Sequence, residues 1–288
     1  MDPEAEGANY RRSELARFLR ACRERTSPVD AGLLDCMPPR RRIRGLRRQE
    51  VAELAGVGMS WYTWLEQGRD ITLTIEVARS LVQAFGLSSD EATYLYSLGG
   101  LTESPVDGLQ RDHAVDLPSD KARASDRCGS SPSELFDVRL VVDGLDRLYP
   151  AYAINRYWEV VAANAHAQRE LGVRVGTNCM VRFFTEAGRQ SWYGRTDLAG
   201  RVLVGRYRQQ VARYPYDSRL QDTVTALMNV PEFRTLWERH EVIASLPGTI
   251  SYRAGGSAAP REYRTIGLTP TTESALSVVL NVPVDDPS

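Results

Sequence analysis

The side chains of this sequence that are best suited to chemistry are arginines, and they crowd into one short stretch. Between Arg11 and Arg48 the chain carries twelve arginines and four acidic residues, which is a local charge of +8. Guanidinium groups pair with phosphate oxygens, so a field of this sign and size suits a polyanion. The formal charge of the whole chain is only -1 and by itself indicates no partner. The charged stretch therefore points to a nucleic acid.

A pattern of two short helices joined by a tight turn follows the arginines directly. Residues 47–55 carry apolar side chains at helical spacing, Gly56-Val57-Gly58 turns the chain, and a second helix is expected over residues 59–67. This succession is typical of a helix-turn-helix, in which the second helix enters the major groove of DNA.

The outward face of that second helix carries groups that can read bases. At about 100° per residue, Tyr62 and Leu65 face inward, with Glu66 near them. The side chains that face outward are those of Ser60, Thr63, Trp64 and Gln67. Hydroxyl and amide groups hydrogen-bond to base edges, and an outward indole packs on a thymine methyl group or a sugar. We predict that these four residues face the bases; the alternative for Trp64 is packing against the arginine-rich loop.

Three arginines are placed to bind the phosphate backbone. Arg47 and Arg48 stand at the N-terminus of the first helix of the pair, where their charge and the helix dipole both favour a phosphate. Arg44 precedes them in the run RRRIRGLRR. We predict that all three contact phosphates, which fixes the orientation of the protein on DNA without reading its sequence.

Five helices within residues 1–98 are expected to position these groups. Residues 26–45 contain several prolines and glycines and predict a long loop. The expected helix boundaries are a cap at Ser13, a helix over residues 47–55, a cap at Ser60 with a stop at Gly68, an opening at Thr72 or Thr74 with a stop at Gly86, and a capping box of Ser88 and Glu91. These signals predict a compact all-helical domain.

The rest of the chain predicts a linker and a second domain of a different class. Residues 99–134 are rich in Asp, Ser, Gly and Pro without periodicity, which indicates a flexible linker. Residues 135–283 then predict a helix over 135–148, hairpin strands over 151–154 and 158–162, helices over 164–171, 196–213, 218–228 and 231–240, and strands over 248–252, 262–268 and 274–282. We expect an α+β domain in which one antiparallel sheet is covered by helices.

The motifs of the first domain resemble those of a known family. GLRRQEVAELAGV followed by SWYTWLEQGRD is similar to the λ-repressor-like helix-turn-helix of the XRE regulator superfamily, and most closely to its MmyB-like branch. The resemblance implies that Arg48 stands where the superfamily has a glutamine that touches phosphate, and arginine keeps a donor there. The position of Trp64 is often arginine in this branch, so the base preference of relatives does not carry over.

The second domain resembles the same family. NRYWEVVAAN, YPYDSRL and PEFRTLWERHEV are similar to motifs of its PAS-like ligand-binding domain, and the resemblance implies a small apolar, fatty-acid-like effector held without a covalent bond. The residues expected to line its pocket are Trp158, Val160, Phe183, Phe184 and Trp237. The alternative for each is a place in the ordinary core. Arg156 and His240 either anchor the headgroup of a ligand or satisfy a turn and a helix end.

Other classes of protein find little support in the sequence. The four cysteines and three histidines show no metal-ligand spacing, and no carboxylate pair or nucleophile stands in a catalytic motif. We therefore expect no enzyme activity, no metal and no cofactor. With no signal peptide and no apolar run of membrane-spanning length, we expect a cytoplasmic protein without a membrane partner.

Together these patterns predict a sequence-specific transcription regulator that binds double-stranded DNA. A homodimer is expected because one such helix reads too few base pairs. The rival interpretation is a protein-interaction module, similar to antitoxins, in which the helix-turn-helix serves for docking. Whether the protein activates or represses, and at which operator, is left open.

Overall fold

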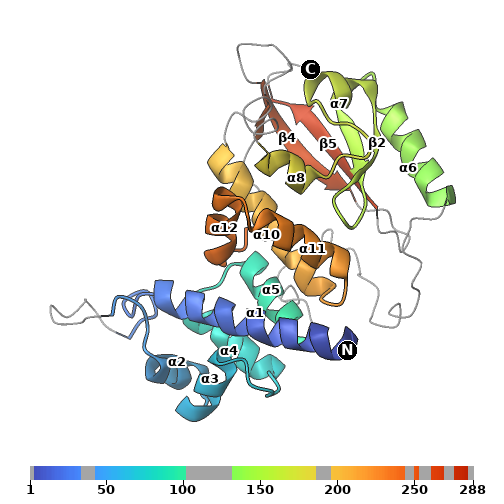
Figure 1. The fold of residues 1–288 in the computed structure, drawn as a ribbon. Helices are drawn as coiled ribbons and strands as arrows, with labels where there is room; N and C mark the ends of the chain where they lie inside the picture. Colours follow the sequence, from blue (N-terminus) through green and yellow to red (C-terminus); the bar gives the residue numbers. More distant parts are fainter. Residues whose placement is uncertain are drawn as a thin grey trace. The chain divides into compact units, whose positions relative to one another are not determined.

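The computed structural model describes residues 3–33, 43–101, 132–185, 196–243, 250–252, 261–268 and 276–284 (Figure 1). It divides into two compact units. The first consists of residues 1–112, 205–221 and 235–244, and the second of residues 113–204, 222–234 and 245–288. Two segments that the sequence assigns to the second domain thus pack with the N-terminal helices. Most of the predicted linker, residues 102–131, lies outside the described residues.

The N-terminal part of the first unit is all-helical, as the sequence predicts. Its helices are α1 (Pro3–Arg25), α2 (Arg48–Ala55), α3 (Met59–Glu66), α4 (Ile75–Phe85) and α5 (Ser89–Gly99). Apolar side chains of all five meet in one core, among them Phe18, Val51, Tyr62, Leu81 and Leu95, which are all fully buried. Burial of these side chains holds α2 and α3 in place.

Two of the predicted helix caps are confirmed. The hydroxyl of Thr74 accepts the backbone N–H of Val77 and opens α4. Ser88 and Glu91 form the predicted reciprocal capping box at the start of α5.

Two other predicted caps are wrong. Ser13 lies inside α1, which already begins at Pro3, because a proline suits the first turn of a helix and no other proline interrupts the segment. Ser60 lies inside α3, since the carbonyl of Gly58 already accepts the N–H of Tyr62 at 3.0 Å. The preceding turn needs Gly56, whose φ of 67° is a left-handed conformation that glycine adopts without strain.

The second unit contains the predicted antiparallel sheet. Its strands are β1 (Ala151–Ile154), β2 (Val160–Ala163), β3 (Ile250–Tyr252), β4 (Arg261–Leu268) and β5 (Ser277–Pro283), in the order β2-β1-β5-β4-β3. Every neighbouring pair is antiparallel. Three helices accompany the strands: α6 (Pro132–Gly144), α7 (Ala165–Glu170) and α8 (Cys179–Phe184). The α+β class of this domain is confirmed.

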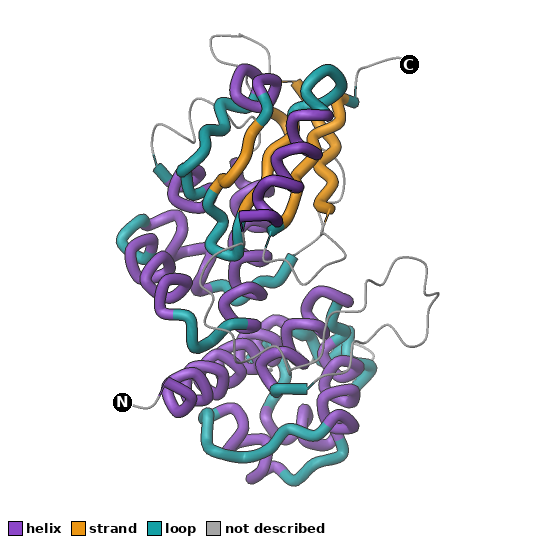
Figure 2. Tube along the Cα trace, turned by 90° about the vertical axis from the view of Figure 1, so that its right-hand side faces the viewer, coloured by secondary structure: helices purple, strands orange, loops and turns teal. Residues whose placement is uncertain are grey.

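Both faces of the sheet are covered. Figure 2 shows a helix lying in front of the strands of the sheet. On one face α6 packs Val138 and Val142 against Ala153 and Ala162. On the other face residues of α7 pack with Val160 and with tyrosines of β3 and β4. The register of β1 and β2 shifts between Ala153 and Ile154, and this bulge turns Val160 to the face opposite Ala162.

Helix α8 is absent from the sequence prediction. The side chain of Asn178 accepts the backbone N–H groups of Met180 and Val181 at 2.9 and 3.1 Å and so caps this short helix. Asparagine is among the preferred N-cap residues. The predicted helix from Asn164 is confirmed by the same device, because the Asn164 side chain accepts the N–H of Ala167 at 2.8 Å.

Three further helices are shared by the two units. These are α10 (Thr196–Arg213), α11 (Ser218–Leu227) and α12 (Pro231–Glu238), close to the ranges predicted from the sequence. The boundary between the units falls inside each of them.

Candidate functional site

The outward face of α3 carries the four side chains predicted to face bases. Ser60 and Gln67 are exposed, and the ring of Trp64 is 42% exposed. Thr63 is half-buried, and its hydroxyl donates to the carbonyl of Met59 at 2.8 Å, which leaves the oxygen as an acceptor. All four lie off the core that buries Tyr62. Base contact by these residues stays a prediction.

Trp64 has a neighbour that the sequence analysis missed. The guanidinium carbon of Arg69 lies 5.6 Å from the centre of the Trp64 ring, which is within the range of a cation–π contact. Arg69 is exposed and follows α3 directly. The pair therefore presents an apolar ring and a positive charge together at the end of the helix. The central part of the arginine-rich loop, residues 34–42, lies outside the described residues.

A buried carboxylate fixes the inner side of α3. Glu66 is fully buried, and three arginines surround it. Arg23 of α1 donates from Nε and Nη2 at 3.1 and 2.8 Å, and Arg48 of α2 donates from Nε and Nη2 at 3.2 Å each. Arg20 of α1 forms a longer ion pair at 3.5 Å. We call these four residues the Glu66 cluster; it joins α1 and α2 to the helix that carries the predicted readout face.

The charge on Glu66 is secured by these arginines. Burial alone would raise the pKa of this carboxyl, but the hydrogen bonds from Arg23 and Arg48 outweigh it and hold the pKa below the usual value. The carboxylate is therefore ionised at neutral pH. Such doubly donated pairs fix geometry as well as charge.

The three arginines predicted to bind phosphate differ in their surroundings. Arg44 and Arg47 are exposed, and the backbone N–H of Arg47 donates to the carboxylate of Glu50 at 2.6 Å. Arg48 is 45% exposed, and two of its guanidinium nitrogens bond to Glu66. Arg48 thus has a structural role that the sequence did not reveal, because its partner lies 18 residues away. Phosphate contact stays a prediction for all three.

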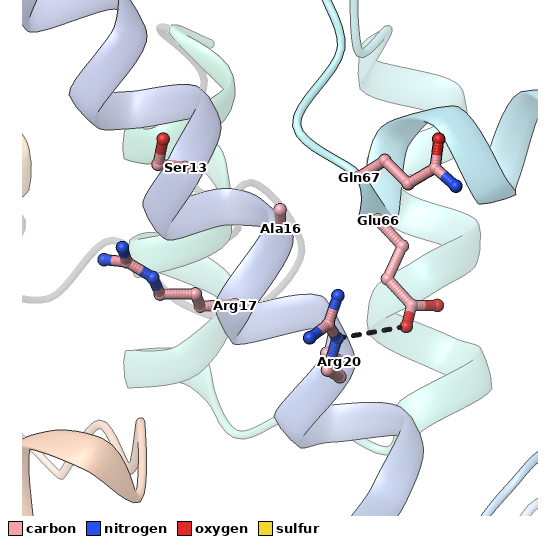
Figure 3. A pocket seen from close by; sticks show the side chains of 6 residues that line it. All are labelled: Ser13, Ala16, Arg17, Arg20, Glu66 and Gln67. Atoms are coloured by element: carbon pink, nitrogen blue, oxygen red, sulfur yellow. Dashed lines mark ion pairs between the residues drawn. The ribbon is translucent and has the colours of Figure 1, made fainter.

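A pocket lies between α1 and the end of α3, next to Gln67, one of the four residues predicted to face bases (the readout face: Ser60, Thr63, Trp64 and Gln67). Its lining consists of Ser13, Ala16, Arg17, Arg20, Glu66 and Gln67. Figure 3 shows Arg20 reaching towards the Glu66 carboxylate, with Gln67 next to Glu66 at the end of α3. The lining is mostly polar and belongs to the first unit, so this is not the apolar pocket predicted for the second domain.

The residues predicted to line the apolar pocket are divided between the two units. In the second unit, Val160, Phe183 and Phe184 are buried. The rings of Phe183 and Phe184 lie 4.9 Å apart, and Phe184 lies 5.2 Å from Phe233. Trp237 belongs to the first unit, where its ring lies under the guanidinium of Arg208 at 4.0 Å.

Trp158 has an unusual backbone. It is half-buried in the connection between β1 and β2, with a φ of 63°. Bulky residues rarely adopt this left-handed conformation, which costs on the order of 1–3 kcal/mol. The turn itself is held by Asn155, whose side chain accepts the N–H groups of Tyr157 and Glu159 at 3.0 Å each. Arg156 stacks near the Tyr157 ring at 5.9 Å.

Neither a metal centre nor a membrane-spanning helix is found in the described part of the chain. None of its helices combines the length and apolar character that a bilayer crossing requires. No group of three or more His, Cys, Asp or Glu side chains among the described residues is placed to hold a metal ion.

Comparison with known families matches both parts of the chain. A family model described as an MmyB-like transcription regulator ligand binding domain matches residues 137–288, and one described as a helix-turn-helix domain matches residues 14–95. A comparison with curated proteins finds no match.

Proposed function

Because this chain belongs to the MmyB-like transcription regulator family, we propose that α3 recognises a specific operator and that the C-terminal domain binds a small apolar effector. DNA binding as a transcription regulator follows from the two matched domains. The specific operator, the class of effector, a homodimer and a cytoplasmic location are the proposal. Recognition of an operator is supported by one observation: the exposed face of α3 lies on a helix whose inner side is fixed by the buried Glu66 cluster.

We assign contacts with bases and contacts with phosphates to different residues according to the exposure of their side chains. Ser60, Thr63 and Gln67 supply donors and acceptors for base edges, and the Trp64 ring with Arg69 covers a thymine methyl group or a sugar. Arg44 and Arg47 lie exposed ahead of α2 and pair with phosphates, with Arg48 contributing from the rim of the Glu66 cluster. A homodimer doubles the operator that one such helix can read.

Selection of binding sites from a random duplex pool tests the readout face. Trp64→Ala or Thr63→Ala should change the ranking of selected sites, with about 1–3 kcal/mol of discrimination lost at the contacted base pair. Gln83→Ala, at an exposed position of α4, is the matched control and should leave the ranking as in the wild type. An unchanged ranking in both α3 variants would remove this face from base readout.

The effector proposal is supported by the strained and half-buried Trp158 beside buried Val160. Strain of this kind persists where the surroundings demand it and is common at ligand sites. Native mass spectrometry of the purified full chain reports a retained apolar molecule and the oligomeric state together. A straight-chain fatty acid serves as the defined probe.

Trp158→Asn separates strain from binding, because asparagine tolerates the left-handed conformation. The variant should be as stable as the wild type or more stable by about 1 kcal/mol, yet should bind the fatty acid more weakly. If fatty-acid binding is unchanged, Trp158 has no part in the pocket.

One observation favours a second candidate function, docking to another protein. Met59 and Trp64 are 54% and 42% exposed on the same short helix, which is unusual for apolar side chains of this size. Duplex binding that weakens with salt supports the DNA function. Its absence, with retained capture of a protein partner by the α3 face, would support docking.

A further inference from the structure

A fully buried arginine lies inside the range matched by the ligand-binding domain family but packs in the first unit. Arg208 of α10 has no exposed surface and belongs to the ligand-binding family match. In the structure it nevertheless packs in the first unit, with the N-terminal helices. Buried arginines are rare unless they are paired.

The partners of Arg208 come from three other segments. Its Nη1 donates to the Glu14 carboxylate at 3.0 Å and lies 3.1 Å from Nδ1 of His240. Its Nη2 donates to the carbonyl of Trp237, and the guanidinium covers the ring of that residue. The hydroxyl of Tyr94 on α5 donates to the same Glu14 oxygen at 3.5 Å. We call these five residues the Glu14 cluster.

The Glu14 cluster combines a buried ion pair, Glu14 with Arg208, and a neutral imidazole, that of His240. Glu14 is 1% exposed and also accepts from Arg17 at 2.6 Å. Burial and the charge of Arg208 lower the pKa of His240 to about 4, so the imidazole is neutral and its Nδ1 accepts the guanidinium proton. Replacing a buried ionic set by well-packed apolar residues is often neutral for stability, whereas removing one member leaves an unpaired buried charge. The ionic set therefore penalises any arrangement of these helices that separates Arg208 from Glu14.

Close packing supports the same contact. A side chain at Gly205 would meet the backbone of Ile243 at 2.7 Å, so α10 and the segment after α12 touch backbone to backbone. Ala212 and Val242 are part of the core that contains Phe18 and Leu95. The 205–221 and 235–244 segments are thus built into the DNA-binding unit.

The helices that carry these residues continue into the other unit. Residues 196–204 of α10 and residues 231–234 of α12 belong to the second unit. Each of these two helices therefore joins residues of the Glu14 cluster to residues of the second unit. On the other side, Glu14 shares α1 with Arg20 and Arg23, which hold the Glu66 cluster beneath α3.

We propose that the Arg208–Glu14 ion pair is the coupling element of this regulator: it transmits a change in the ligand-binding domain through α1 to the readout helix α3. The inference rests on the proposed DNA-binding function. It assigns Arg208 and Glu14 a positioning role, because both side chains are buried inside the first unit, away from the exposed face of α3. By thermodynamic reciprocity, DNA bound to α3 must in turn affect α10 and α12.

Hydrogen exchange of the full chain with and without DNA tests this coupling, with a duplex selected from a random pool as the probe. In the wild type, the duplex should slow exchange in residues 205–213 and 235–243 by about fivefold or more, the usual lower range of coupling. The Glu14→Gln/Arg208→Gln double variant removes both charges together and should bind the duplex while losing this remote effect. Arg213→Gln, at an exposed site on the same helix, should keep it.

Two results would overturn the coupling. One is a remote effect that persists in the double variant, and the other is a wild type that binds the duplex without any remote effect. Should the double variant fold poorly, Arg208→Lys keeps the charge but loses the forked contacts, and it should reduce the remote effect.

A comparison without DNA separates this inference from the proposed function. The double variant should exchange faster than the wild type in α3 as well as in residues 235–243. Faster exchange confined to residues 205–243 would overturn the coupling. A wild type that binds no duplex would instead contradict the proposed function.

Discussion

Among the described residues, two carboxylates are buried, those of Glu14 and Glu66; each is neutralised by arginine, and they differ in where their partners come from. Glu66 takes its arginines from α1 and α2, all within the residues matched by the helix-turn-helix domain. Glu14 takes Arg208 from a helix 194 residues away, in the range matched by the ligand-binding domain. The Glu66 cluster therefore holds α1, α2 and α3 of the helix-turn-helix domain together. The Glu14 cluster instead joins α1 of that domain to α10. The same kind of ion pair, arginine with a buried carboxylate, thus stabilises one domain internally at Glu66 and connects α10 to that domain at Glu14.

Removal of the Glu66 carboxylate should have the largest effect. Glu66→Ala leaves Arg23 and Arg48 beside each other without the buried carboxylate they share, and Arg23 keeps only a longer pair with the exposed Glu24 at 3.4 Å, so the free energy of unfolding should fall by about 3–5 kcal/mol. Chemical denaturation measures this loss. Glu53→Ala, at an exposed carboxylate that accepts from Gln49, should change it by less than about 0.5 kcal/mol.

The comparison predicts a different pattern for Glu14→Ala. The loss should be of similar size, since Arg208 remains buried without its partner. In hydrogen exchange, however, Glu66→Ala should loosen residues 43–70, while Glu14→Ala should also loosen residues 205–213 and 235–243. Identical exchange patterns in the two variants would contradict the different roles given to the Glu66 cluster and the Glu14 cluster.

Acid should weaken the two clusters one after the other. His240 has a folded pKa near 4 against an ordinary value of 6.5, so the unfolded chain binds the proton first. Stability should therefore be full above pH 6.5 and fall as the pH drops towards 4, by up to about 1.4 kcal/mol per pH unit. Glu66 has a lowered pKa, so its contribution is lost only below its ordinary value of 4.5.

His240→Asn isolates the first of these steps. Asparagine tolerates the φ of 50° at this position and does not titrate. The free energy of unfolding of the variant should stay constant between pH 6.5 and 4.5 and should still fall at lower pH. A variant that keeps the wild-type slope in that window would show that another group titrates there.

The smallest expected effect distinguishes two neighbouring arginines. Arg47→Ala should reduce the slope of log affinity for DNA against log salt by about 0.9 and leave stability unchanged, because Arg47 is exposed. Arg48→Ala should lower stability as well, since two of its nitrogens bond to Glu66. Salt titrations and thermal melts of both variants decide this. Equal stability of the two variants would remove Arg48 from the Glu66 cluster.

Much of the fold follows from local signals in the sequence. The caps of α4, α5 and α7 depend on side chains within three residues, and the range of α10 was predicted to the residue. The sequence misplaces the start of α1 and the cap of α3, because a serine that could cap a helix lies inside each of these two helices. The six residues of α8 are too few to show a periodicity, and its cap at Asn178 was overlooked, although the equally short α7 is predicted from the same kind of cap at Asn164.

The candidate site divides in the same way. Exposure of Ser60, Trp64 and Gln67 follows from their angular positions around α3, which the sequence alone gives. The second role of Arg48, the stacking of Arg69 on Trp64 and the place of Trp237 in the first unit depend on partners that are not neighbours at helical spacing.

By itself, the sequence determined a helix-turn-helix with a polar outward face, a basic approach to it and an α+β domain behind it. These features rest on short-range periodicity, turn residues and charge. Only the tertiary structure decided which charges are buried together. Glu14 reads as an ordinary acid on an arginine-rich helix until Arg208 is brought against it. Pairing across such a distance depends on how α10 and α12 pack, and no local pattern carries that information.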